Sequence, residues 1–318
     1  MTAAEQPGGA CAACGVTLNG RYCHACGQDT EARPRPLRDM ALEAFSETSL
    51  IDGQGVRTLV ALVTRPSRIL IAYREGAGSL YASPVKIFVV VTALFLAVLN
   101  FSDVVIYQYV RQVEPGAQVT ARSNPDGVTV HVTGASEQTR WMQRRVDVPI
   151  DPRIHQAMQD AAARADTEAD RQNLLYEIQS DIEQEIITER LSAWLPNAIW
   201  LLTPLFALLL APLFGRRRLF MEHLVFAMWA HVTAFTLLML LALANRFGAN
   251  LPAWPLAIPY LIYFTRAASR YYGMSMGSAA WRSVAHAALY LLLVLAPAGI
   301  VVAISALDLQ ALAAFIAA

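Results

Sequence analysis

Long apolar runs separated by polar stretches occupy the middle and the C-terminal part of the chain. A helix needs about 20 mostly apolar residues to cross about 30 Å of hydrocarbon, and only about 10 to form part of a soluble core. Five runs meet or approach this length: 85–107, 194–214, 223–244, 251–270 and 284–307. The fourth run is the least regular, because its apolar part ends near Phe264 and it carries three prolines. The pattern predicts a mainly α, polytopic bundle of about five transmembrane helices.

The polar segment 108–193 separates the first and second predicted spans. Within 119–150, the turn signal Asn124-Pro125-Asp126-Gly127 is followed by the strand-like alternation Gly-Val-Thr-Val-His-Val-Thr-Gly. This pattern favours a β-hairpin. Residues 152–192 are rich in Ala, Gln, Glu, Asp and Arg and contain no internal Pro or Gly, which predicts one or two helices leading into the second span. We therefore expect an α+β insertion here.

Two further segments precede the first span. Residues 1–30 contain all four cysteines, and residues 31–84 carry short amphipathic patterns. In 31–84, apolar residues recur at helical spacing around Leu37, Met40 and Phe45, and again at Leu59 and Leu62. These patterns fit helices lying on the cytosolic membrane surface, and they fit a small cytosolic helical cap equally well.

Composition supports a membrane protein. Of the 318 residues, 55% are hydrophobic and 16% are charged, whereas soluble domains average about 25% charged. The formal net charge is zero, which argues against a general nucleic-acid binder, because such proteins need a basic excess.

The positions of Lys and Arg predict the orientation, since positive residues in short loops stay in the cytosol. They flank alternate ends of the spans: Arg65, Arg68, Arg74 and Lys86, then Arg216, Arg217 and Arg218, then Arg266, Arg270 and Arg282. The first 84 residues contain no apolar stretch of signal-peptide length. We expect a cytosolic N-terminus, an extracytoplasmic 108–193 segment and an extracytoplasmic C-terminus.

The cysteines form two C-x-x-C pairs, Cys11 with Cys14 and Cys23 with Cys26, each followed by a glycine. Four thiolates presented by two tight turns make the closed tetrahedral site that structural zinc prefers. The sequence therefore predicts a cytosolic zinc ribbon that holds one structural Zn²⁺ ion. Metal binding would supply folding free energy that so short a segment cannot obtain from a core.

Other interpretations of the cysteines remain open. His24 lies within the second pair and could compete as a ligand, and C-x-x-C pairs also occur in redox proteins. A redox role is disfavoured by the reducing cytosol and by the absence of a βαβ pattern around the pairs. A closed site leaves no position for a substrate, so we expect the ribbon to bind a protein partner or simply to fold the terminus. Nearby arginines fit juxtamembrane positive charge better than nucleic-acid binding.

Ionisable residues inside a span are functional candidates, because burying them in lipid costs free energy. Glu222 and His223 open the third span, and His231 lies two helical turns further on nearly the same face. The three could pass protons or hold a metal. The alternative places Glu222 and His223 at the cytosolic interface and makes His231 a hydrogen-bonded bundle residue.

Sequence motifs of catalysis are not found in the chain. We find no Ser-His-Asp set, phosphate-binding glycine loop or His-Glu-x-x-His helix, which argues against an enzyme.

Several short motifs together resemble a widespread family of uncharacterised bacterial multi-pass membrane proteins with an N-terminal four-cysteine zinc ribbon. They are Tyr22-Cys23-x-x-Cys26-Gly27-Gln28, Arg57-Thr58-Leu59, Tyr81-x-Ser83-Pro84 and Glu222-His223-Leu224. The chain departs from that family at 74–78, where a Gly-Lys-Arg run is common, and at His231, which is the only one kept of a common histidine pair. The resemblance implies a bacterial inner-membrane location and carries no established activity.

These observations favour a non-enzymatic adaptor, scaffold or regulatory protein of the membrane, with the zinc ribbon as its docking module. The alternative is a small transporter or channel that uses Glu222, His223 and His231, and a membrane enzyme is a third hypothesis with no residues to support it. The sequence specifies no oligomeric state.

Overall fold

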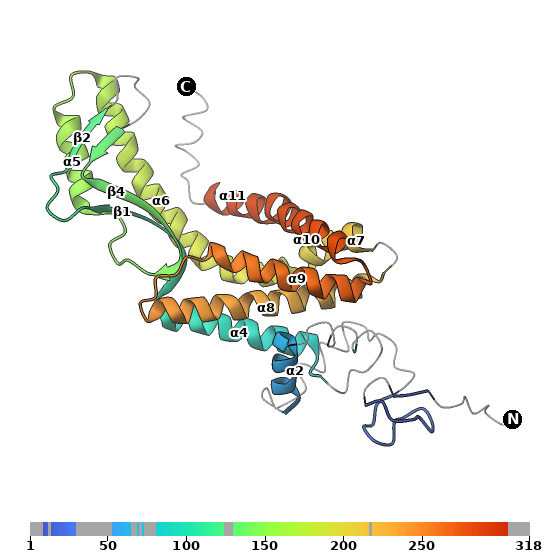
Figure 1. Cartoon of the computed structure of the whole chain (residues 1–318). Helices are drawn as coiled ribbons and strands as arrows, with labels where there is room; N and C mark the ends of the chain where they lie inside the picture. Colours follow the sequence, from blue (N-terminus) through green and yellow to red (C-terminus); the bar gives the residue numbers. More distant parts are fainter. Residues whose placement is uncertain are drawn as a thin grey trace. The chain divides into compact units, whose positions relative to one another are not determined.

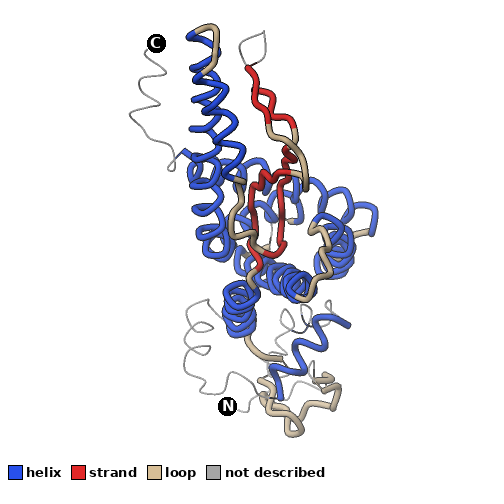
Figure 2. Tube along the Cα trace, turned by 90° about the vertical axis from the view of Figure 1, so that its left-hand side faces the viewer, coloured by secondary structure: helices blue, strands red, loops and turns tan. Residues whose placement is uncertain are grey.

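The computed structural model describes residues 9–11, 14–29, 53–64, 69, 72, 81–123, 130–215 and 218–304. Within them the chain is mainly helical, with a small amount of sheet (Figures 1 and 2). Several features used above lie outside these residues: the amphipathic pattern at 37–45, Arg65, Arg68, Arg74, the turn at 124–127, Arg216, Arg217 and the chain beyond 304.

The chain divides into two compact units. Unit 1 comprises Met1–Ala97, Ile199–Met239 and Trp254–Val294, and unit 2 comprises Val98–Ala198, Leu240–Ala253 and Leu295–Ala318. Nine α-helices are described: α2 (Gly53–Thr64), α4 (Pro84–Ser102), α5 (Pro152–Ala163), α6 (Glu168–Leu201), α7 (Thr203–Phe214), α8 (Phe220–Arg246), α9 (Ala257–Tyr272), α10 (Met276–Tyr290) and α11 (Ala296–Ile304). A 3-10 turn (η2, Trp254–Leu256) precedes α9, and a π-turn (η3, Leu291–Leu295) joins α10 to α11.

Three of the described helices are long and apolar enough to cross a membrane: Pro84–Ser102, Phe220–Arg246 and Met276–Val302. The predicted count of five spans is not confirmed. The predicted span 194–214 is divided at Leu202 between α6 and α7, and Pro204 lies in the first turn of the new helix. The predicted span 251–270 contains the 3-10 turn and the 16-residue α9.

Aromatic side chains form much of the interior of unit 1. Phe95 of α4 stacks on Phe235 of α8 with ring centroids 4.9 Å apart, and Phe226 of α8 meets Phe264 of α9 edge to face at 5.1 Å. Helix α10 packs against α9 and α7. Residues 224–232 of α8 are all buried, as expected for a helix surrounded by others.

Unit 2 contains the sheet. Strands β1 (Val104–Val113) and β4 (Ala135–Arg144) pair antiparallel from Val104↔Arg144 to Val113↔Ala135. Strands β2 (Thr120–Ser123) and β3 (Val130–Thr133) form the second pair, which confirms a hairpin within 119–150. Helices α5 and α6 confirm the helices predicted for 152–192, and α5 begins after Asp151, whose side chain accepts a hydrogen bond from the N–H of Arg153.

The first predicted span ends too late. Helix α4 stops at Ser102, Asp103 has a left-handed φ of 59°, and the last residues of the predicted 85–107 span belong to β1. The run Val104-Val105-Ile106 is β-branched, so it suits a strand as well as an apolar helix. Apolarity alone could not distinguish the two.

Candidate metal centre and buried polar clusters

Two backbone turns of the same design position the four cysteines. In the first, the N–H of Gly15 donates to the Cys11 carbonyl (2.8 Å) and the N–H of Cys11 to the Val16 carbonyl (2.8 Å). In the second, the N–H of Gly27 donates to the Cys23 carbonyl (2.8 Å) and the N–H of Cys23 to the Gln28 carbonyl (2.9 Å). Gly15 and Gly27 have φ values of 80° and 74°, a conformation that favours glycine.

The turns bring all four sulfur atoms within 4.8 Å of one another. The Sγ atoms of Cys11 and Cys26 are 3.7 Å apart, and those of Cys14 and Cys23 are 3.5 Å apart. Tetrahedral thiolate ligands at about 2.3 Å from a zinc ion would have sulfurs about 3.8 Å apart. The predicted ligand set is therefore assembled, with a geometry that a metal ion fits.

The thiols depend on one another for their ionisation. A hydrogen bond from the Ala25 backbone, with smaller help from Cys26 and Cys14, lowers the pKa of Cys23 to about 6. Although the Gln28 backbone opposes it, burial and the neighbouring Cys23 raise the pKa of Cys26 to about 12. Four adjacent thiolates repel one another, so a bound cation is what would allow all four to ionise.

The rest of this module, residues 9–29, holds little apolar material. Among its described residues only Cys11, Cys23 and Gln28 are buried. Arg21 closes the second turn with two hydrogen bonds to the Asp29 carboxylate, at 3.1 and 3.2 Å. His24 is exposed and lies outside the metal-ligating group found among the described residues, so the structure gives no support to it as a ligand.

The predicted intramembrane set Glu222, His223 and His231 does not form one site. Glu222 pairs with Arg218 at 2.9 Å, and the ring of His223 bonds to the Tyr272 hydroxyl (2.9 Å) and the Gly215 carbonyl (3.2 Å). His231 bonds through Nδ1 to the Ala227 carbonyl of its own helix at 2.8 Å. Glu222 and His223 therefore belong to one cluster and His231 to another.

The neighbour of His231 is a histidine that the sequence analysis did not single out. The Phe206 ring packs against both histidines, with its centroid 4.8 Å from that of His231 and 4.3 Å from that of His286. His286 is buried and bonds to the Phe206 carbonyl at 3.1 Å. His286 lies within the last predicted span, so the rule that ionisable residues inside a span are functional candidates could have identified it from the sequence. The Tyr290 hydroxyl, one turn further along α10, is buried and has no hydrogen-bond partner among the described residues.

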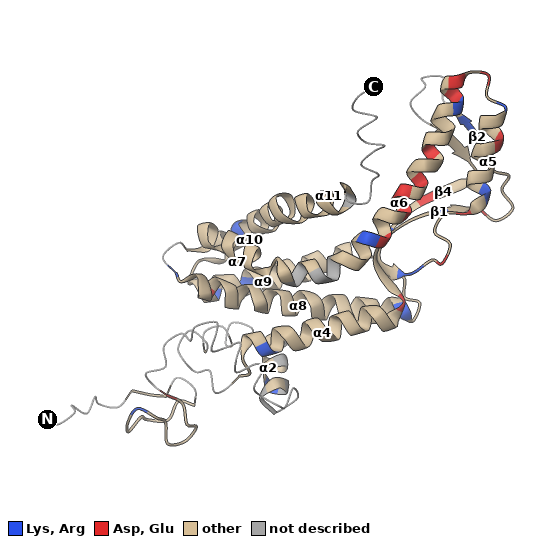
Figure 3. Cartoon of the chain, turned by 180° about the vertical axis from the view of Figure 1, so that it is seen from behind, with Lys and Arg blue, Asp and Glu red and all other residues tan. Residues whose placement is uncertain are grey.

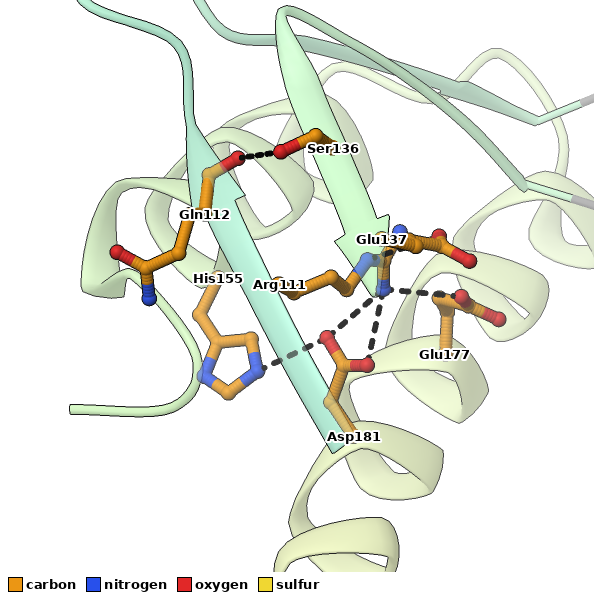
Figure 4. A network of polar contacts seen from close by, with 7 residues as sticks. All are labelled: Arg111, Gln112, Ser136, Glu137, His155, Glu177 and Asp181. Atoms are coloured by element: carbon orange, nitrogen blue, oxygen red, sulfur yellow. Dashed lines mark hydrogen bonds and ion pairs between the residues drawn. The ribbon is translucent and has the colours of Figure 1, made fainter. Parts of the chain in front are cut away.

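A buried ion network in unit 2 was not predicted. Arg111 of β1, whose side chain is 2% exposed, donates through Nη1 to both Asp181 oxygens (2.9 Å each) and to Glu177 (3.1 Å) on α6 (Figure 4). Glu137 of β4 lies 3.1 Å from its Nε, and His155 of α5 lies 3.3 Å from Asp181.

The network joins both long strands to helices α5 and α6, and its carboxylates outnumber its guanidinium three to one. Burial, reinforced by Asp181 and Glu137, raises the pKa of Glu177. The partners are 26 to 70 residues apart in sequence, so no local motif reveals them. The arrangement is a network of ion pairs centred on Arg111, with His155 hydrogen-bonded to Asp181 at its edge.

Residues 52–96 match the family described as "Protein of unknown function (DUF3667)". This stretch includes α2 and most of α4, and it is closed by a hydrogen bond from the Ala82 N–H to the buried Thr58 hydroxyl (2.9 Å). Lys86, expected as a flanking positive charge, is buried. No curated protein and no solved structure matches the chain. The chain is thus similar, over this stretch, to an uncharacterised family.

Proposed function

We propose that the chain is a multi-pass protein of the bacterial inner membrane whose N-terminal module, stabilised by zinc, docks a protein partner. The observation that carries this proposal is the closed four-cysteine site, with its sulfurs within 4.8 Å of one another. Such a site has no open coordination position for a substrate, so it supports a rigid binding surface and not a reaction at the metal.

The surface of the module suits protein binding. The side chains of Tyr22 and Val16 are 60% and 38% exposed. Both residues lie next to the two cysteine turns, whose hydrogen bonds hold the backbone in place. The Arg21 guanidinium lies over the Tyr22 ring, 5.4 Å from its centroid. Exposed tyrosine and arginine held on a rigid backbone are typical anchors of protein interfaces.

The proposed topology has a cytosolic N-terminus and five spans, with the C-terminus and the 108–193 segment outside. Three helices of sufficient length and the Lys and Arg pattern support it. Reporter fusions after residues 145 and 250 would both be active outside the cytosol, and a cytosolic result at either position would overturn this orientation.

The docking proposal is tested by affinity purification of the full chain from native membranes, followed by mass spectrometry. Wild type is compared with Tyr22→Ala, with Cys23→Ser/Cys26→Ser and with the exposed-residue control Asn19→Ala. We expect a partner to be retained by wild type and Asn19→Ala, and to be lost from Tyr22→Ala, which keeps its metal, and from the cysteine variant. Failure of wild type to retain a partner, where known membrane complexes survive, would contradict the proposal.

A transporter is the second candidate, favoured by His231 and His286, which are buried within apolar helices and both contact Phe206. It predicts that His231→Ala and His286→Ala abolish a proton flux in proteoliposomes, read with a pH-sensitive dye, while Glu222→Gln in the other cluster has less effect. Unchanged flux in both histidine variants would exclude this function.

A further inference from the structure

In unit 2, the C-terminal ends of α4 and α8 are hydrogen-bonded to the β1–β4 pair or to the residue that follows it. These bonds lie close to the first residues of β1 and the last residues of β4. Asn245, near the end of α8, is 1% exposed; its Nδ2 donates to the carbonyls of Met142 (2.6 Å) and Leu251 (2.9 Å), and its Oδ1 accepts from the Leu251 N–H (2.7 Å). At the end of α4, the Asp103 carbonyl accepts from the Arg145 N–H at 2.7 Å. These hydrogen bonds therefore fix the backbone at the point where α4 and α8 end beside the β1–β4 pair.

This place is surrounded by exposed aromatic side chains. Phe101 at the end of α4 is 81% exposed, Phe247 just after α8 is 86% exposed, and Trp141 on β4 is 51% exposed. Trp141 is packed against its cross-strand partner Tyr107, with ring centroids 4.7 Å apart. Rigid exposed aromatics at the end of apolar helices match the aromatic belt that lies at lipid headgroup level.

Arginines lie in the same place. Arg144 and Arg145 are exposed at the end of β4, and Arg246 ends α8, 3.8 Å from the Asp103 carboxylate. We name Phe101, Trp141, Arg144, Arg145, Arg246 and Phe247 the collar. The arginine side chains can lay their methylenes along apolar surface and reach phosphate with the guanidinium.

The charge distribution of unit 2 gives the collar a preferred partner. Segment 110–193 contains 14 Asp and Glu against 9 Arg, yet three of these arginines fall within 140–145, a stretch with no acidic residue. Seven of the 14 acidic residues are spread along α6 instead (Figure 3). An anionic surface would therefore attract the collar and repel the remainder of the segment.

We propose that the collar binds the headgroups of anionic phospholipids and holds the start of the β1–β4 pair at the membrane surface. The aromatic rings sit among headgroups and upper acyl chains, and Arg144 and Arg145 contact lipid phosphate. This role is independent of the zinc module and of its partner.

The test uses the full chain in vesicles of brominated phosphatidylglycerol or brominated phosphatidylcholine, with quenching of tryptophan fluorescence as the readout. The difference between wild type and Trp141→Phe isolates Trp141. We expect Trp141 to be quenched in both lipids and, in mixtures, to show a preference for phosphatidylglycerol that falls about tenfold in Arg144→Gln/Arg145→Gln and weakens at high salt.

The matched control is Arg122→Gln/Arg164→Gln, which removes two exposed arginines of unit 2 outside the collar and should leave the preference unchanged. Amide exchange in α5 and α6 shows whether each variant keeps its fold. Absence of quenching at Trp141 would overturn the proposal. So would equal quenching by the two brominated lipids in mixed vesicles, or a loss of preference as large in the control as in the collar variant.

Discussion

The cysteine module and unit 2 are stabilised in opposite ways. The module, residues 9–29, buries only Cys11, Cys23 and Gln28 among its described residues. Unit 2 has an apolar cluster formed by Val113, Ala121, Ile154, Met158, Ala162 and Leu174, together with the Arg111 ion network. With the proposed zinc ion bound, the module would take its folding free energy from a ligand, whereas unit 2 takes it from its own side chains. The two regions should therefore respond independently to the same treatment.

Removing the metal should produce the largest difference between them. Zinc binding contributes about 10–16 kcal/mol to folding in comparable small modules, so a strong chelator or Cys23→Ser/Cys26→Ser should abolish amide protection throughout 9–29. Protection of α5 and α6 should not change. Hydrogen exchange with mass spectrometry measures both regions in one sample, and re-addition of Zn²⁺ should restore the chelated wild type but not the variant.

Breaking the ion network should destabilise unit 2 and leave the cysteine module unchanged. Arg111→Met leaves Asp181 and Glu177 without their cation in a largely buried place, which should cost about 3–5 kcal/mol of the opening free energy of α6 amides. The metal content of the module should stay at wild-type level. The double variant Arg111→Met/Asp181→Leu should recover part of the loss, and a double variant as unstable as the single one would argue against charge burial as the cause.

A glycine substitution probes the metal turns alone. Gly27 has a φ of 74°, where a side chain costs about 1–2 kcal/mol, so Gly27→Ala should weaken zinc affinity about tenfold. Gly20 in the same module has an ordinary φ and open space around it, so Gly20→Ala serves as the control. Competition with a chromophoric chelator measures both affinities, and equal values would show that the turn geometry does not limit binding.

The smallest effect concerns Glu177. Because burial raises its pKa, its stabilising contribution is complete below the pKa of the unfolded chain and is lost as pH rises through the raised folded value. Glu177→Gln should therefore be neutral or stabilising by about 0.5 kcal/mol at pH 7, and it should flatten the fall in α6 protection between acidic and neutral pH. A clear loss of protection at pH 7 would mean that its bond to Arg111 outweighs burial.

The features that could be predicted from the sequence are those whose parts are close in the chain. The four cysteines lie within Cys11 to Cys26, and the composition of segment 152–192 indicates helix along its whole length. Both features could therefore be predicted. The Arg111 network joins four elements that only the folded chain brings together, so it was missed.

Apolar runs were the ambiguous case. They marked three helices of membrane-spanning length but did not show that Val104 starts a strand or that Leu202 interrupts a helix. Strand formation and helix breaks depend on β-branching and on proline placement, which hydropathy does not measure.

The Asn245 contacts have a mechanical consequence. Since one side chain joins the end of α8 to the backbone of β4, a shift of α8 along its axis must carry Met142 with it. A flexible loop at this point would absorb such a shift. The 2.6 Å hydrogen bond to Met142 instead passes it to β4, while the two bonds to Leu251 hold the Asn245 side chain in place. The last turns of α8 (Leu240–Arg246) and the β1–β4 pair belong to the same unit, and this bond makes them move together.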